Sequence, residues 1–175
     1  MNEREVSYVT YTQKHRDIII TGATAINDFL NNKDVSEKRS LLFCLDMYLD
    51  PYFGYELSYF DEIILLLEKH LLFDHCKEIK QDILQLLNDY SKNKLDYLAD
   101  HIEEIEFELL ADALYALSNT FNKEYIPVFI LFENHQNQNV SDTAKNALIE
   151  LSKKNCESVA CNCCNENREE IPDAK

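Results

Sequence analysis

Residues 111–151 have the sequence ADALYALSNTFNKEYIPVFILFENHQNQNVSDTAKNALIEL. Apolar side chains recur three or four positions apart through most of this stretch, which is the period of an α-helix with one buried face. Polar residues separate three such apolar blocks from one another. The stretch therefore predicts three helices joined by short connections, over 107–121, 124–132 and 141–152.

Similar apolar blocks occur earlier in the chain. Four of them begin at positions 41, 83, 113 and 147, at spacings of 42, 30 and 34 residues. Each of the last three follows another apolar segment of helical period. A recurring unit of this length is typical of stacked helix pairs, which present a long surface rather than a single deep pocket.

The same patterns predict the remaining elements. Ser36 and Ser141 each precede an apolar helical period, and we expect them to be N-caps. Gly22 lies inside the first helix and is expected to kink it. The aromatic segment 51–59 either packs over the end of the helix stack or binds a partner. Further helices are predicted over 15–32, 37–49, 61–73, 76–90 and 95–105.

The composition favours an all-α domain. The chain has 175 residues, of which 46% are hydrophobic, but only two glycines and three prolines. So few turn-forming residues argue against a sheet-rich fold and exclude glycine-rich phosphate loops. The polar N-terminus and the lack of an apolar run of about 20 residues predict a cytoplasmic protein.

We expect three regions along the chain. Residues 1–14 form an extension that is either a short strand or an extended arm packed on the first helix. Residues 15–154 form the helical domain. Residues 155–175 are rich in Cys, Asn and Glu and are expected to form a mobile tail.

The net charge is −15 at pH 7, and residues 37–135 carry −12 of it. Such a field repels nucleic acid and anionic membranes and attracts a basic protein. The alternative is that the acidity only keeps the protein soluble.

The candidate binding residues are polar or aromatic positions between the apolar ones of the second helix in each pair, together with Glu104 at the preceding turn. Asp112, Tyr115 and Asn119 have the i, i+3, i+7 spacing that places them on one helix face. Carboxylates beside an aromatic ring suit a cationic partner, although any of these residues also fits an ordinary solvated face. The predicted set is Asp46, Tyr48, Asp82, Gln85, Asp89, Glu104, Glu108, Asp112, Tyr115 and Asn119.

No motif in the sequence predicts catalysis, and we expect neither an enzyme nor a cofactor. His70 and His75 flank Asp74 but lack the zincin spacing, so we interpret them as histidines at the surface or at a helix C-terminus. Four cysteines near the end are weak metal-ligand candidates, with free thiols, redox chemistry or disulfide-linked dimers as alternatives. They are Cys156, Cys161, Cys163 and Cys164.

Residues 107–152 resemble HEAT repeats, and residues 36–106 do so more loosely. The resemblance lies in the alanine and leucine spacing of 111–117 and 144–151, in Pro127 early in a helix, and in Val140 before the next one. It implies an all-α, HEAT-like α-solenoid of about four antiparallel helix pairs with an N-terminal extended arm.

In size, charge and architecture the chain also resembles immunity proteins of bacterial polymorphic toxin and contact-dependent inhibition systems. That resemblance implies a protein that neutralises a basic toxin, most often a nuclease, by occluding its active site with acidic side chains. A HEAT-like scaffold or adaptor in a larger complex is the alternative. A metal chaperone that uses the cysteine tail is a third hypothesis.

Overall fold

The computed structural model describes residues 9–92 and 94–160, with side chains as far as Lys153. The described residues form nine α-helices and no strand, which confirms the all-α class. No helix among them is both long enough and apolar enough to cross a membrane. The helices are α1 (Gln13–Thr21), α2 (Ala23–Asn32), α3 (Val35–Leu49), α4 (Phe60–Phe73), α5 (Lys77–Tyr90), α6 (Asp96–Asp100), α7 (Leu110–Asn119), α8 (Ile126–Phe132) and α9 (Gln138–Ala160). Three short 3-10 helices cover Pro51–Phe53, Ile102–Glu104 and Lys123–Tyr125.

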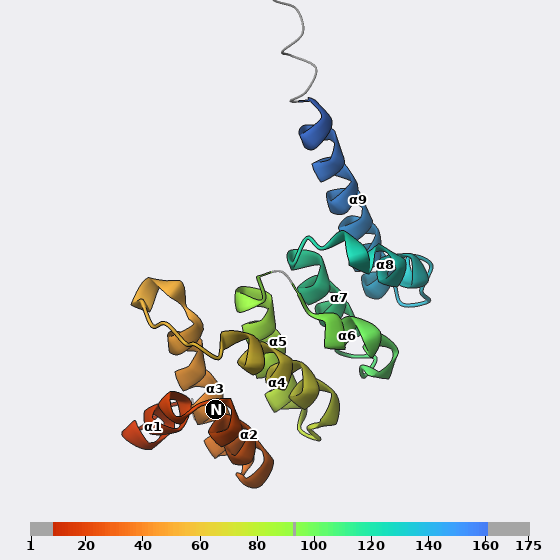
Figure 1. Cartoon of the computed structure of the whole chain (residues 1–175). Coiled ribbons are helices and arrows are strands. Elements are labelled where there is room, and N and C mark those ends of the chain that lie inside the picture. The colour runs from red at the N-terminus through yellow and green to blue at the C-terminus, as the bar shows by residue number, and fades with distance from the viewer. Residues whose placement is uncertain (1–8, 93, 161–175) are drawn as a thin grey trace, which may run out of the picture.

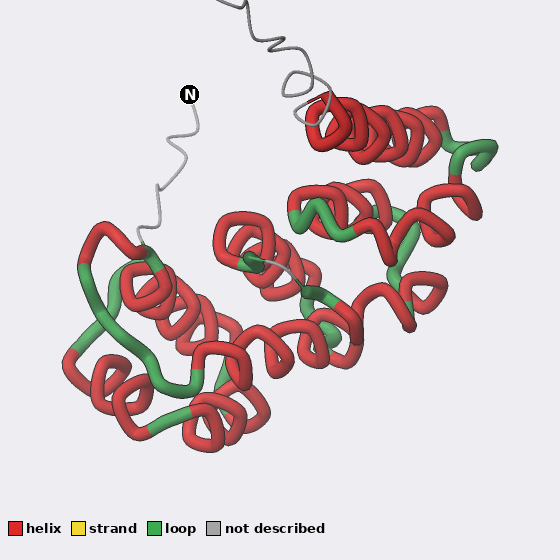
Figure 2. The backbone as a smooth tube through the Cα atoms, turned by 45° about the horizontal axis from the view of Figure 1, so that its top comes forward, coloured by secondary structure: helices red, strands yellow, loops and turns green. Residues whose placement is uncertain are grey.

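The helices pack in an elongated array. Helices α3, α5, α7 and α9 contact one another in succession, and α2, α4 and α6 do the same. Contacts between α4 and α5 and between α6 and α7 join the two series, and α8 packs on α9. Helices α1 and α9 therefore lie at opposite ends of the molecule (Figure 1), and Figure 2 shows the helices ranged side by side between these ends.

A single apolar core runs through this array. In α4, Ile63, Leu67 and Leu71 are fully buried, as the i, i+4, i+8 spacing of one helix face requires. Burying each such side chain contributes about 1.5–3 kcal/mol relative to leaving it in water. The leucine and isoleucine periods of the sequence therefore set which face of each helix points inward.

Gly22 breaks the first predicted helix rather than kinking it. Its φ of 122° lies in a region that L-residues with a side chain rarely adopt. The segment 15–32 is therefore two helices, with α1 ending at Thr21 and α2 beginning at Ala23.

Both predicted serine caps are wrong. Helix α3 begins at Val35, and the side chain of Asp34 accepts a hydrogen bond from Glu37 N at 3.0 Å. Helix α9 begins at Gln138, and Asn137 Oδ1 accepts from Val140 N at 3.2 Å. Ser141 instead lies inside α9, where its hydroxyl donates to the carbonyl oxygen of Glu133 at 2.6 Å.

Other predicted helices have different lengths. The segment 95–105 contains the short α6 and a 3-10 turn instead of one helix. Helix α9 continues to Ala160, beyond the predicted start of the tail at 155, and the remaining tail residues lie outside the described part of the chain.

The described part of the N-terminal arm has no strand and packs on α3. Tyr11 donates its hydroxyl hydrogen bond to Met47 Sδ at 3.4 Å, and its ring lies 5.7 Å from that of Phe43. Residues 1–8 lie outside the described residues. The aromatic segment 51–59 both packs and projects, since Tyr55 stacks on buried Tyr48 while Tyr52 is 87% exposed.

Candidate functional site

An acidic groove lies between α3 and α5. Its cavity has a volume of about 320 Å³, and four of the predicted binding residues line it, namely Asp46, Asp82, Gln85 and Asp89. The remaining lining residues are Val9, Arg39, Leu42, Phe43 and Leu86. The structure therefore brings together residues from two helices that the sequence assigned to separate repeats.

Helical spacing positions the α5 side of this groove. Asp82, Gln85 and Asp89 follow the i, i+3, i+7 pattern of one face, and Gln85 donates to Asp89 at 2.7 Å. Arg39 of α3 binds Asp82 through Nε and a terminal nitrogen, at 2.7 and 3.2 Å. This fork ties α3 to α5 and neutralises one of the three carboxylates that line the groove.

The other carboxylates create a local negative potential at the C-terminal ends of α3 and α5. The Tyr90 hydroxyl donates to Asp46 at 2.7 Å. Burial raises the pKa of Tyr90, and the hydrogen bond to Asp46 and the charges of Asp46, Asp50 and Asp89 raise it further. Among the described residues Asp46 and Asp89 form no ion pair, so their charges remain available to a partner.

An exposed aromatic ring borders these carboxylates. Phe43 is 49% exposed and lines the groove, together with Val9 from the N-terminal arm. Apolar area next to carboxylates suits the side chain of lysine or arginine, which has an apolar stem and a cationic head.

The other predicted binding residues lie outside the groove. Asp112 and Tyr115 are exposed on α7, whereas Asn119 is partly buried and donates to Asn88 of α5 at 3.2 Å. Glu104 and Glu108 are exposed in the segment that precedes α7.

Tyr48 is not at the surface, because Tyr55 covers it and leaves it 6% exposed. The expectation that it projects outward is therefore wrong.

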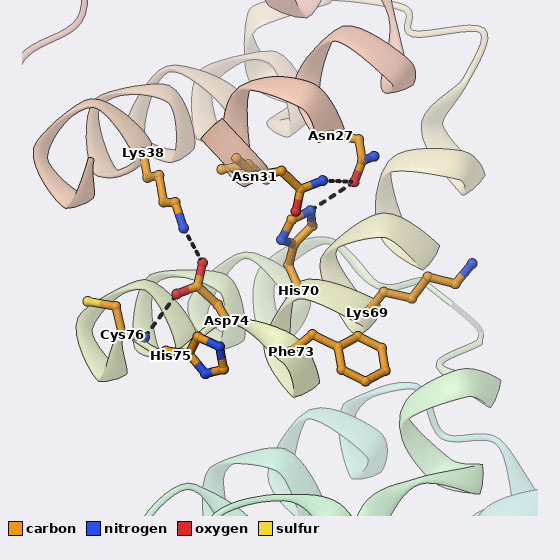
Figure 3. A pocket seen from close by; sticks show the side chains of 10 residues that line it. Asn27, Asn31, Lys38, Lys69, His70, Phe73, Asp74, His75 and Cys76 are labelled. Atoms are coloured by element: carbon orange, nitrogen blue, oxygen red, sulfur yellow. Dashed lines mark hydrogen bonds and ion pairs between the residues drawn. The ribbon is translucent and has the colours of Figure 1, made fainter. Parts of the chain in front are cut away.

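A second cavity, of about 670 Å³, lies where α2, α3 and α4 meet the turn that leads into α5 (Figure 3). Lys38 of α3 binds Asp74 of this turn at 2.5 Å, and Asp74 also accepts from the backbone N–H of Cys76 at 2.9 Å. Burial acts to raise the pKa of Asp74, but these two hydrogen bonds, together with the charges of Lys38 and His70, hold that pKa below its usual value. Asp74 is therefore a fixed carboxylate whose two oxygens both accept hydrogen bonds.

His70 forms the wall opposite this ion pair. Its Nε2 lies 3.0 Å from Asn27 Oδ1, which also accepts from Asn31 Nδ2 at 3.2 Å (Figure 3). Because Asn27 offers an oxygen there, Nε2 of His70 carries the hydrogen. Burial lowers the pKa of His70, and the nearby charge of Asp74 only partly opposes that effect.

Sequence reasoning did not find this cavity. His70 lies in the last turn of α4, which confirms the helix C-terminus that was one of its two expected positions, but it is only 8% exposed and is not a surface residue. His75 is exposed, as expected. Lys38 and Asp74 are 36 positions apart. No local pattern relates such distant residues, so only the packing of α3 against the α4–α5 turn reveals the site.

Metal ligands do not gather within the described residues, where no three His, Cys, Asp or Glu side chains are placed to hold an ion. The side chains of Cys156, Cys161, Cys163 and Cys164 lie outside the described residues, so that prediction stays open. Cys44 is buried, and burial raises the pKa of its thiol to about 11. At neutral pH it is therefore a thiol that packs in the core.

Comparison of the sequence with models of known protein families found no match, and neither did comparison with curated proteins.

Proposed function

We propose that this protein is a non-catalytic binding module that captures a basic protein through the acidic groove between α3 and α5. The observation that carries the proposal is the convergence of the two unpaired carboxylates, Asp46 and Asp89, on one groove beside exposed Phe43. Two helices held by a common core present these groups, so little conformational entropy is lost when a partner binds.

The charge of the whole chain supports the same assignment. Residues 37–135 carry a net charge of −12, and they include both walls of the groove. A field of this sign accelerates the encounter with a cationic protein and makes the association rate fall as salt is added.

More specifically, we propose that the protein is an immunity protein with a HEAT-like α-solenoid fold. The successive contacts of α3, α5, α7 and α9, with a second helix packed on each of α5, α7 and α9, support the solenoid. The carboxylates would occupy the positions at which a nuclease toxin holds phosphates with lysine and arginine. Inhibition would then occur by occlusion of the toxin's active site.

The test uses the product of the adjacent gene as the probe. We expect its purified basic domain to bind this protein, and its nuclease activity to fall in proportion to the complex formed. The variant Asp46→Asn/Asp89→Asn should associate more slowly and with a shallower salt dependence, because two unpaired groove charges are lost. The matched control Asp61→Asn/Glu62→Gln removes two exposed charges from the first turn of α4 and should bind as the unmodified protein does.

Full nuclease activity in the presence of excess protein would contradict the proposed immunity function. Equal loss of binding in the groove variant and the α4 control would remove the groove as the binding site.

An alternative function is that of a scaffold in a larger complex. Ile130 and Leu131 are 53% and 58% exposed on α8, in the last helix pair of the array. Apolar side chains exposed at the end of a helical array favour a stable neighbour there. The replacement Ile130→Ser/Leu131→Ser would abolish association in that case and would leave binding at the acidic groove unchanged.

A further inference from the structure

The cavity beside His70 has the size and the polar lining of a small-molecule site. Its volume of about 670 Å³ lies within the usual range of ligand pockets, about 300–1,000 Å³. Leu30 and Phe73 supply apolar wall, while Lys38 and His70 supply polar groups from two different helices. None of these residues belongs to the acidic groove.

The cationic groups of this cavity have unused donors, whereas its carboxylate is already engaged. Asp74 accepts from Lys38 and from the backbone N–H of Cys76. A lysine ammonium has three N–H donors, and Lys38 directs one of them at Asp74. Lys69 also lines the cavity, but its ammonium lies 5.6 Å from the centre of the Tyr97 ring and points away from Lys38 and His70 (Figure 3). The unused donors of Lys38 are therefore the groups that an anionic oxygen would meet here.

His70 narrows the choice of anion. Its Nε2–H is directed at Asn27, so Nδ1 of the neutral ring has a lone pair. Nδ1 lies on the side of the ring that faces Lys38 and Asp74 (Figure 3), and no hydrogen bond reaches it from the part of the chain that the structure describes. A ligand that uses both groups therefore donates a hydrogen bond to Nδ1 and carries a negative charge for Lys38.

We propose that this cavity binds a phosphate group, with a P–OH donating to His70 Nδ1 and an anionic oxygen accepting from Lys38. A phosphate monoester has a second pKa of about 6, so near neutral pH part of it still carries one proton together with a negative charge. Sulfate and carboxylates have no such proton at neutral pH, so they cannot donate a hydrogen bond to Nδ1. The site therefore distinguishes phosphate from other oxyanions by its proton.

The test follows the imidazole resonances of the full chain by NMR at pH 6.5, with inorganic phosphate as the probe. We expect phosphate to shift the His70 resonances saturably, while sulfate at equal ionic strength leaves them in place. His101 and His135, which do not line the cavity, report any general effect of salt. Unchanged His70 resonances in phosphate, or equal shifts in both salts, would overturn the proposal.

A pair of double variants tests the role of Lys38. Lys38→Met/Asp74→Asn removes both members of the ion pair, which leaves no uncompensated buried charge. A hydrogen bond to a charged group contributes about 1.5–3 kcal/mol, so phosphate affinity should fall at least about tenfold. The control Arg39→Met/Asp82→Asn removes the neighbouring α3–α5 ion pair, which does not line this cavity, and should retain the affinity.

Equal phosphate affinity in these two variants would contradict the assignment of Lys38. If the first variant does not fold, the comparison of phosphate with sulfate on the unmodified protein decides the proposal.

Discussion

At the scale of single residues, Glu68 is a carboxyl group buried between α4 and α6. It is 3% exposed, and its Oε2 accepts a hydrogen bond from Leu98 N at 2.7 Å, which satisfies one of the free N–H groups at the start of α6. Burial raises the pKa of Glu68 to about 7, although the N–H groups of Leu98 and Tyr97 oppose that shift and the charge of Asp96 adds to it.

The raised pKa of Glu68 makes the folded state bind more protons than the unfolded state between about pH 4.5 and pH 7. The contribution of Glu68 to stability is therefore fully present below pH 4.5 and is lost as pH rises through 7. Glu68→Gln keeps an oxygen acceptor for Leu98 N without the charge. We expect the variant to exceed the original protein in free energy of unfolding at pH 8 by on the order of 1 kcal/mol. Urea unfolding at pH 5 and pH 8 measures this, and a variant that is less stable at pH 8 would contradict it.

His15 acts on stability in the opposite sense to Glu68. Its Nδ1 accepts from Thr12 N at 3.0 Å, which requires the ring to be neutral at that nitrogen. Burial lowers the pKa of His15, while Glu37, 3.7 Å from Nε2, partly opposes the shift. Its stabilising contribution is lost as pH falls from about 6.5 through the lowered pKa. The pKa of His70 is also lowered by burial. In the Glu68→Gln variant, the free energy of unfolding should therefore fall as pH falls over this range.

At the scale of helices, two substitutions distinguish Asp34 from Ser36 as the N-cap of α3. Asp34 accepts from Glu37 N and lies at the positive end of the helix dipole. Asp34→Ala should lower the free energy of unfolding by about 0.5–2 kcal/mol. Ser36→Ala is the matched control, because Ser36 is exposed inside α3, and it should change stability by less than about 0.5 kcal/mol. Chemical denaturation of both variants checks this, and a larger loss for Ser36→Ala would reverse the assignment.

Helix boundaries were predictable where an apolar period decides them. Helices α4 and α5 begin within one residue of the expected positions and end where expected, because regular leucine and isoleucine spacing extends to their ends. The prediction failed at 95–105, where the carboxyl of Glu68 caps a short helix from a neighbouring element. It also failed at Gly22, because the sequence gives no sign of whether a glycine bends a helix or ends it.

Part of the acidic groove was also predictable. Its α5 side follows from helical spacing alone, since Asp82, Gln85 and Asp89 are polar positions between apolar ones. Tyr48 satisfied the same criterion, yet it is buried because Tyr55 from the next segment stacks on it at 4.4 Å. Periodicity gives the face of a helix, but it does not reveal what another segment places on that face.

At the scale of the whole molecule, the charge distribution opposes the fold. With a net charge of −15, mutual repulsion among carboxylates raises the free energy of the compact state. Added salt screens this repulsion, since the Debye length falls from about 30 Å at 0.01 M to about 10 Å at 0.1 M. The melting temperature at pH 7 should therefore rise with NaCl over that range.

The unpaired groove carboxylates Asp46 and Asp89 should account for part of this repulsion, because in the free protein no cationic partner neutralises them. Asp46→Asn/Asp89→Asn should be more stable than the original protein in low salt, by on the order of 0.5 kcal/mol, and should show a smaller rise in melting temperature with NaCl. The control Lys145→Asn removes an exposed cation from α9 and should show a larger rise. Thermal unfolding of the three proteins in 0.01 and 0.1 M NaCl makes the comparison. If the groove variant is the least stable of the three in low salt, its carboxylates act as hydrogen-bond acceptors that support the fold, and the argument that they are held there for a cationic partner loses its energetic basis.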